Sequence, residues 1–131
     1  MNKKKIIIDG IRYNDIDGFY DEIDKVLTKG LTWRTGHNLD ALNDLLRGGF
    51  GVHEYGEAIV IIWKNAKKSR VDFGYDATIK HYERVLTRCH PTNANSVSSL
   101  LEDAKQKKGA TLFEILIQLI QSHDNIELKL K

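Results

Sequence analysis

Ala58-Ile59-Val60-Ile61-Ile62-Trp63 decides the fold, because all six side chains are apolar. A strand that is apolar on both faces is typical of the centre of a covered parallel sheet. Lys5-Ile6-Ile7-Ile8, closed by the turn pair Asp9-Gly10, predicts a second strand. Ile126-Glu127-Leu128-Lys129-Leu130 alternates as a third strand does. The sequence therefore predicts three strands, with residues 58–63 in the middle.

In the segments between these strands, apolar residues recur with helical spacing. Apolar residues from Ile16 to Leu27 predict an amphipathic helix that starts at Asn14 or Asp15 and ends at Gly30. Thr111-Leu112-Phe113-Glu114 has the capping-box pattern and opens a core helix that runs to about residue 121. Strands separated by helices predict an α/β fold with a three-stranded parallel sheet packed by helices.

Residues 65–109 begin with a basic run and lack the apolar strand patterns of the rest of the chain, and they predict a helical insertion before the last helix. The run from Lys64 to Arg70 is basic, Asp76 can cap a helix that continues to Cys89, and another helix ends at Gly109. Cys89 falls on the apolar side of its helix, so we expect a buried structural thiol. The length of 131 residues, 41% of them hydrophobic, fits a single domain over residues 1–131.

Composition excludes several classes of protein. The N-terminus has only Ile6-Ile7-Ile8 as an apolar stretch, which is too short for a signal peptide, and no run is long enough to span a membrane. Cys89 is the single cysteine, which excludes an internal disulfide and favours a reducing compartment. We therefore expect a cytoplasmic protein without a membrane partner.

The motif Gly36-His37-Asn38-Leu39-Asp40-Ala41-Leu42-Asn43-Asp44-Leu45-Leu46 carries the functional prediction. Asn38 can cap a short helix in which Asp40 and Asp44 share one face, opposite the leucines. The helix dipole favours Asp40 in the first turn, whereas Asp44 gains little from it, and Arg47 can relieve the pair. Although the net charge of the chain is +2, residues 36–57 carry four acids and one base, which gives −3. Spacing alone leaves open a solvated acidic face or a binding site.

With its Ile-rich first strand, amphipathic helix and core helix, the motif resembles the barstar family of intracellular inhibitors of guanyl-specific ribonucleases. The resemblance covers roughly residues 5–64 and 110–131, and it implies that an acidic helix occupies the ribonuclease active site in place of RNA phosphates. Such a protein needs no cofactor. By resemblance, Asp40 and Asp44 are the principal contacts. The implied surrounding contacts are Trp33, Thr35, Gly36, His37, Asn38, Asn43 and Arg47.

Three differences from the family concern the partner. Barstar is acidic overall whereas this chain is slightly basic, and the aromatic residues that flank the family's helix are replaced by Arg34, Thr35, Asn43 and Gly49. The family's glutamate near the start of the last helix has no clear match here. A ribonuclease toxin or another ribonuclease is therefore left open as the partner.

Other functions are less well supported by the sequence. His37 with Asp40 and Asp44 lacks a nearby nucleophile, which disfavours catalysis. The spacing of His81, Cys89 and His90 does not match a metal site. The basic residues Lys3–Lys5 and Lys64–Arg70 could contact nucleic acid, although a solvated charge run is the simpler interpretation.

Two structural questions follow from the motif. Because a cleft that accepts Asp40 and Asp44 must be basic, we expect the cationic insertion to lie away from the acidic helix, on another side of the sheet. Trp33, Phe50 and Tyr55 flank the helix in sequence, and the sequence does not decide whether they are interface anchors or core residues.

Overall fold

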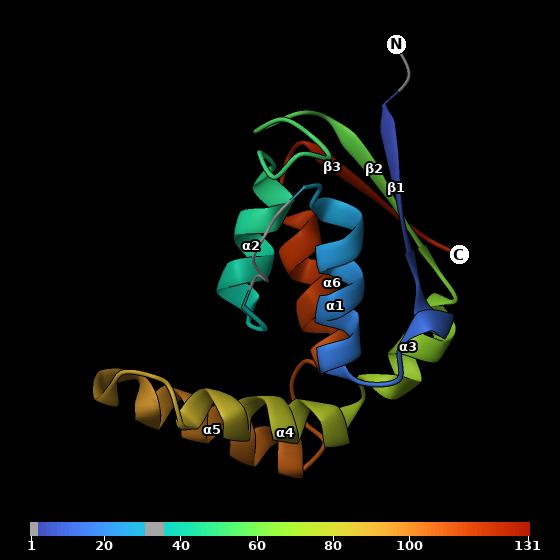
Figure 1. Cartoon of the computed structure of the whole chain (residues 1–131). Helices are drawn as coiled ribbons and strands as arrows, with labels where there is room; N and C mark the ends of the chain where they lie inside the picture. The colour runs from blue at the N-terminus through green and yellow to red at the C-terminus, as the bar shows by residue number, and fades with distance from the viewer. Residues whose placement is uncertain (1–2, 31–35) are drawn as a thin grey trace.

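The computed structural model describes residues 3–30 and 36–131, and its centre is one three-stranded parallel sheet (Figure 1). The strand order is β1-β2-β3, so the chain moves in one direction across the sheet. The apolar stretch is the central strand, as predicted, and Ile61 pairs with Ile6 on one side and Leu128 on the other. The strands are β1 (Lys4–Asp9), β2 (Ile59–Lys64) and β3 (Ile126–Leu130).

Six α-helices connect and extend these strands within the described residues. Asp15 caps α1, and Thr111 and Glu114 form the predicted capping box of α6. The prediction that Asp76 caps α4 is wrong, because Gly74 occupies the cap position and Asp76 lies in the first turn. The helices are α1 (Ile16–Leu27), α2 (Leu39–Arg47), α3 (Ala66–Asp72), α4 (Tyr75–Leu86), α5 (Ala94–Lys105) and α6 (Leu112–Gln121).

The main core lies between the sheet and helices α1, α2 and α6, which all cover the same face (Figure 1). Right-handed crossovers that proceed in one direction across a sheet place their helices on one side, which explains this arrangement. The expectation of a sheet covered on both faces is only partly met. On the second face Val60 is buried, but Ile7 is 43% exposed. The resulting architecture confirms the predicted α/β fold class.

A buried polar cluster joins β2 to α3. The Trp63 indole Nε1 donates to the Tyr13 hydroxyl at 2.8 Å, and that hydroxyl lies 2.6 Å from the Ser69 hydroxyl. Burial raises the pKa of Tyr13 to about 12, so its phenol stays neutral and suits this site. Ser69 and Phe73 are fully buried. Helix α3 is therefore packed into the core, although its residues fall within the predicted insertion.

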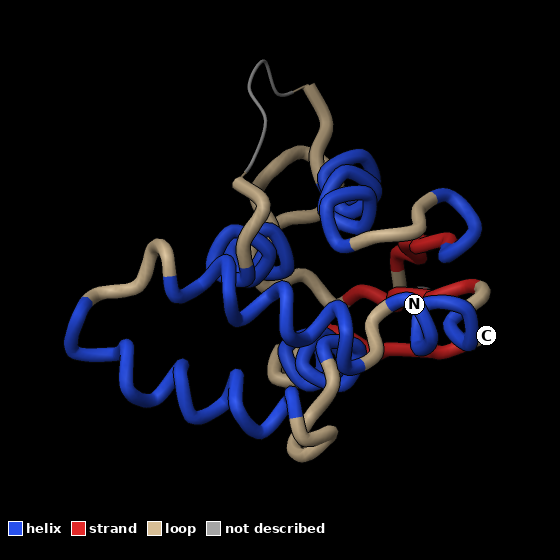
Figure 2. Tube along the Cα trace, turned by 90° about the horizontal axis from the view of Figure 1, so that it is seen from below, coloured by secondary structure: helices blue, strands red, loops and turns tan. Residues whose placement is uncertain are grey.

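The part of the insertion that projects is the α4–α5 hairpin, residues 75–105 (Figure 2). Its two ends are tied together at the base. The Tyr75 hydroxyl donates to the Gly109 carbonyl at 2.9 Å, and the Leu112 backbone N–H donates to the Thr78 hydroxyl at 2.7 Å. The chain thus enters and leaves the α4–α5 hairpin side by side, next to the start of α6.

Candidate functional site

Helix α2 presents the two motif acids to solvent on a firmly seated helix. Asp40 and Asp44 are exposed, whereas Leu42, Leu45 and Leu46 on the opposite side are at most 2% exposed. The Asn38 side-chain oxygen accepts a hydrogen bond from the Ala41 backbone N–H at 2.8 Å, which caps the helix as predicted. The motif therefore forms a rigid acidic helix face.

The two acids differ in their local partners. Asp44 lies 3.7 Å from Arg47, and both side chains are more than half exposed, so water screens this ion pair. Asp40 has no ion-pair partner among the described residues. Both carboxylates can therefore meet a cationic partner at little cost to the fold.

Asn43 has a role that the motif did not indicate. The resemblance implies that Asn43 contacts the partner, but the residue is half-buried, and its side-chain oxygen accepts from His123 Nε2 at 2.8 Å. Burial lowers the pKa of His123, which favours the neutral ring that makes this bond. Asn43 therefore holds α2 against the turn that precedes β3.

His37 fixes the motif loop to α1. Its Nδ1 lies 3.0 Å from Asp17, its Nε2 lies 3.0 Å from Asp21, and its ring packs against Tyr20 at 5.4 Å between centroids. His37 directly precedes the helix cap Asn38. The contacts of His37 with α1 therefore set the entry of the chain into α2.

Arg84 of the α4–α5 hairpin extends this connection. Its guanidinium forms two parallel bonds to Asp17, at 3.0 and 3.1 Å. The bonds from Arg84 have the largest effect on the pKa of Asp17, and the bond from His37 has the next largest. Together they hold this pKa below its ordinary value of 3.8. Arg84, Asp17 and His37 form a continuous link from the insertion to the motif loop.

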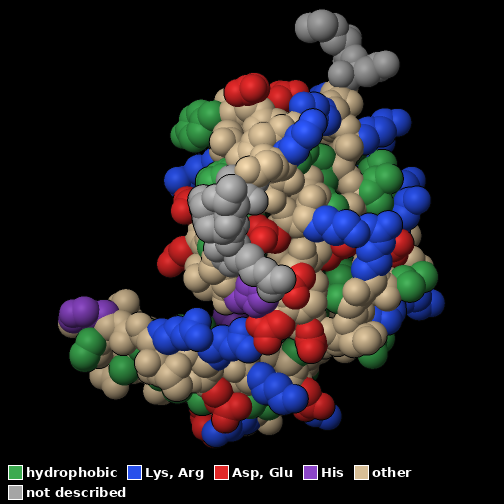
Figure 3. Space-filling view, viewed as in Figure 1, with side chains coloured by type: hydrophobic (Ala, Val, Ile, Leu, Met, Phe, Trp, Pro, Cys, Tyr) green, Lys and Arg blue, Asp and Glu red, His purple; other side chains and the backbone are tan. Residues whose placement is uncertain are grey.

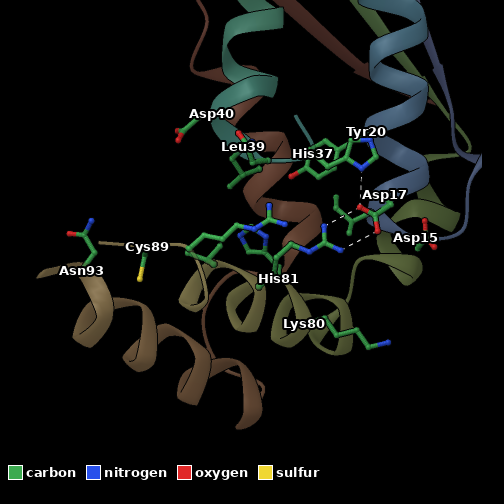
Figure 4. Close-up of a pocket in the computed structure, with 15 residues that line it drawn as sticks. Asp15, Asp17, Tyr20, His37, Leu39, Asp40, Lys80, His81, Cys89 and Asn93 are labelled. Carbon is green, nitrogen blue, oxygen red and sulfur yellow. Dashed lines mark hydrogen bonds and ion pairs between the residues drawn. The ribbon is translucent and has the colours of Figure 1, made fainter. Parts of the chain in front are cut away.

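A groove of about 670 Å³ separates the start of α2 from α4. The prediction that the insertion lies away from the acidic helix is therefore wrong, because residues of both line the same groove (Figure 4). The pairing of Arg84 with Asp17 provides a physical reason, since it holds α4 against the acids of α1. The groove is lined by residues of α1 and the preceding cap (Asp15, Ile16, Asp17, Tyr20), of the motif (His37, Asn38, Leu39, Asp40) and of α4 with the following turn (Lys80, His81, Arg84, Val85, Arg88, Cys89, Asn93).

The thiol and imidazole groups of the insertion have separate surroundings. The expectation of a buried Cys89 is wrong, because α4 ends at Leu86 and Cys89 is only partly buried beyond it. Burial lowers the pKa of His81. His90 bonds to Thr92 at 2.9 Å. In the part of the chain that the structure describes, no three His, Cys, Asp or Glu residues are grouped to hold a metal ion.

The other residues that the sequence suggested as partner contacts differ in their exposure. Gly36 is exposed at the motif loop, and Phe50 packs partly buried against the core. Tyr55 is 78% exposed. Trp33 and Thr35 lie outside the described residues.

Part of the basic run serves the fold. The Lys68 ammonium donates to the Tyr13 carbonyl and to Asp72, each at 2.6 Å, and the Arg70 guanidinium lies 4.7 Å from the Phe113 ring centre. Lys64 and Lys67 remain exposed. The run is therefore not a uniformly solvated stretch, and it presents less free positive charge than its sequence suggests.

We expect Asp17→Asn to reduce the sensitivity of the fold to acid. A carboxyl whose pKa is lowered by folding adds stability above its unfolded pKa, here near 3.8, and this contribution disappears as the pH falls through the lower folded pKa. The variant should be less stable than the parent at pH 7, and the difference should shrink below pH 4. Urea unfolding at both pH values measures this. A difference that is independent of pH would contradict the assignment.

One comparison with known proteins identifies a family. The sequence model of the family described as Barstar (barnase inhibitor) matches residues 4–120. This range includes the motif, the sheet strands β1 and β2, and the α4–α5 hairpin. Comparison with curated proteins gives no match. None of the helices among the described residues is long and apolar enough to cross a membrane. Membership implies a ribonuclease as the protein partner, and the matched range establishes the identity of the fold: this chain belongs to the barstar family.

Proposed function

We propose that this protein inhibits a ribonuclease by inserting the acidic face of α2 into the enzyme's basic active-site cleft. The observation that carries this proposal is the exposure of Asp40 and Asp44 on one face of a helix whose other face is buried. The family match supports the kind of partner.

Electrostatics favours such a complex. A cleft that binds RNA must carry positive charge, and a rigid helix with two carboxylates matches it in shape and sign. Asn38, Asn43 and His37 hold the helix in place before the partner arrives, so little conformational freedom is lost on binding. The principal contacts are Asp40 and Asp44, and Gly36, His37, Asn38 and Arg47 form the surrounding contacts.

The mechanism is occlusion, without chemistry performed by the inhibitor and without a cofactor. The protein would act in the cytoplasm of the cell that makes it. There it would block either that cell's own ribonuclease or a ribonuclease toxin delivered from outside, as an immunity protein does. A neighbouring gene for a signal-bearing ribonuclease would favour the first role, and a neighbouring toxin gene would favour the second.

Titration of ribonuclease activity tests the proposal. We expect the protein to inhibit a guanyl-specific ribonuclease, with barnase as the first probe, in a one-to-one ratio on a fluorogenic RNA substrate. If barnase remains active, the partner is taken from the host lysate and secretome by affinity capture, and its RNA cleavage is then titrated. Direct RNA binding with a steep salt dependence, and no inhibited ribonuclease, would contradict the proposal and favour a nucleic-acid-binding module.

A further inference from the structure

The groove between α2 and α4 continues the proposed binding surface. Asn38 and Asp40 belong to that surface and also line the groove. Any protein that covers Asp40 therefore reaches the edge of the groove and comes close to α4. The insertion would therefore lie next to the bound partner.

The two sides of the groove carry opposite charge. Asp40 lies on the α2 side, whereas Lys80 belongs to α4 (Figure 4). Arg88 follows in the turn after α4. In the space-filling view, blue side chains lie along the upper edge of the hairpin, and red side chains lie below them (Figure 3). Asp17 neutralises Arg84, but neither Lys80 nor Arg88 has an ion-pair partner in residues 3–30 and 36–131. Ile16, Leu39 and Val85 give the groove an apolar component.

This charge pattern restricts which ribonuclease can bind. A cleft that is uniformly basic would be attracted by Asp40 and repelled by Lys80 and Arg88, since charges closer than about 8–10 Å are poorly screened. A partner whose cleft is bordered by an acidic loop would be attracted by both sides.

We propose that the groove receives a loop of the partner ribonuclease that carries an acidic residue next to an apolar one. The acidic residue faces Arg88, and the apolar residue packs against Leu39 and Val85. This inference rests on the proposed function and deepens it. The α4–α5 hairpin then selects among ribonucleases, while Asp40 and Asp44 provide the contact to the cleft.

Charge reversal at Arg88 tests the inference, using the ribonuclease that the wild-type protein inhibits. We expect Arg88→Glu to weaken binding by at least about tenfold, because an acid would then face the acidic loop. Lys108→Glu is the matched control. It makes the same charge change at an exposed residue that does not line the groove, and its Kd should stay within about twofold of the parent.

The sign of the effect is decisive. Tighter binding by Arg88→Glu would show a basic partner surface over α4, and an unchanged Kd would show that the partner does not reach the hairpin, so either result overturns the inference. If Asp40→Ala weakens binding in the same assay, the proposed function survives that failure. If no ribonuclease is inhibited, both proposals fail. Thermal unfolding of each variant confirms that the fold is intact.

Discussion

Asp40→Ala and Asp44→Ala should each weaken ribonuclease binding by about 2 kcal/mol or more, which corresponds to a rise in Kd of roughly thirtyfold. Each carboxylate would be desolvated against a basic cleft, and its removal would leave cationic groups of the enzyme unpaired. Strong coupling between close charge pairs is already known from the barnase–barstar interface, so an effect of this size has a precedent in the family. Titration calorimetry with the inhibited ribonuclease measures the change.

The stability of the fold provides the control for this prediction. Both acids are exposed, and Asp44 has only the screened pair with Arg47, so the free energy of unfolding should change by less than about 0.5 kcal/mol. Variants that bind like the parent would show that the acidic face of α2 is a solvated surface. Variants that unfold would show that these acids serve the fold.

Phe73→Ala should lower the free energy of unfolding by about 3–5 kcal/mol, as expected for removal of a fully buried aromatic side chain. Phe73 is 0% exposed. Its ring stacks on Tyr13 with centroids 5.8 Å apart and meets the edge of Phe19 at 5.7 Å. Its carbonyl also accepts from the Phe113 backbone N–H, at the start of α6. Urea unfolding followed by circular dichroism measures the loss.

Two further variants keep this prediction testable. Val71→Ala lies two residues away in α3 at a side chain that is 78% exposed, so we expect a change within about 0.5 kcal/mol. Phe73→Leu keeps most of the buried volume and should cost less than the alanine variant. If Phe73→Ala were as stable as Val71→Ala, the base of the insertion would not be part of the core.

The fold was predictable from the sequence where local pattern and tertiary packing agree. Residues 58–63 are apolar without interruption, and Asn38 and Thr111 are placed to cap their helices, so strand, helix and cap signals all point the same way. Helix α3 was missed because Lys64 to Arg70 has the pattern of a solvated charge run. Its helical state depends on Ser69 and Phe73 packing against residues far away in the chain.

The candidate site was predictable only in part. The shared face of Asp40 and Asp44 was predictable from their spacing, because it follows from the helical repeat alone. The bonds of His37 to α1, of Asn43 to His123 and of Arg84 to Asp17 join residues that are 16 to 80 positions apart. No local pattern encodes such contacts. The insertion lies beside the motif because Arg84 pairs with Asp17 of α1, and the charge of the partner's cleft alone does not predict this position.

The closed base of the α4–α5 hairpin has a consequence for how this protein can diversify. Tyr75 bonds to Gly109, Thr78 bonds to Leu112 and Arg84 bonds to Asp17, so the rest of the molecule meets the hairpin through contacts on its first half, up to Arg84. Residues further out can be exchanged, lengthened or shortened with little effect on the sheet, since closing a somewhat longer loop between anchored ends costs little entropy. The hairpin is thus a replaceable module beside a constant acidic helix, and a new target could be acquired by changing one segment of the chain.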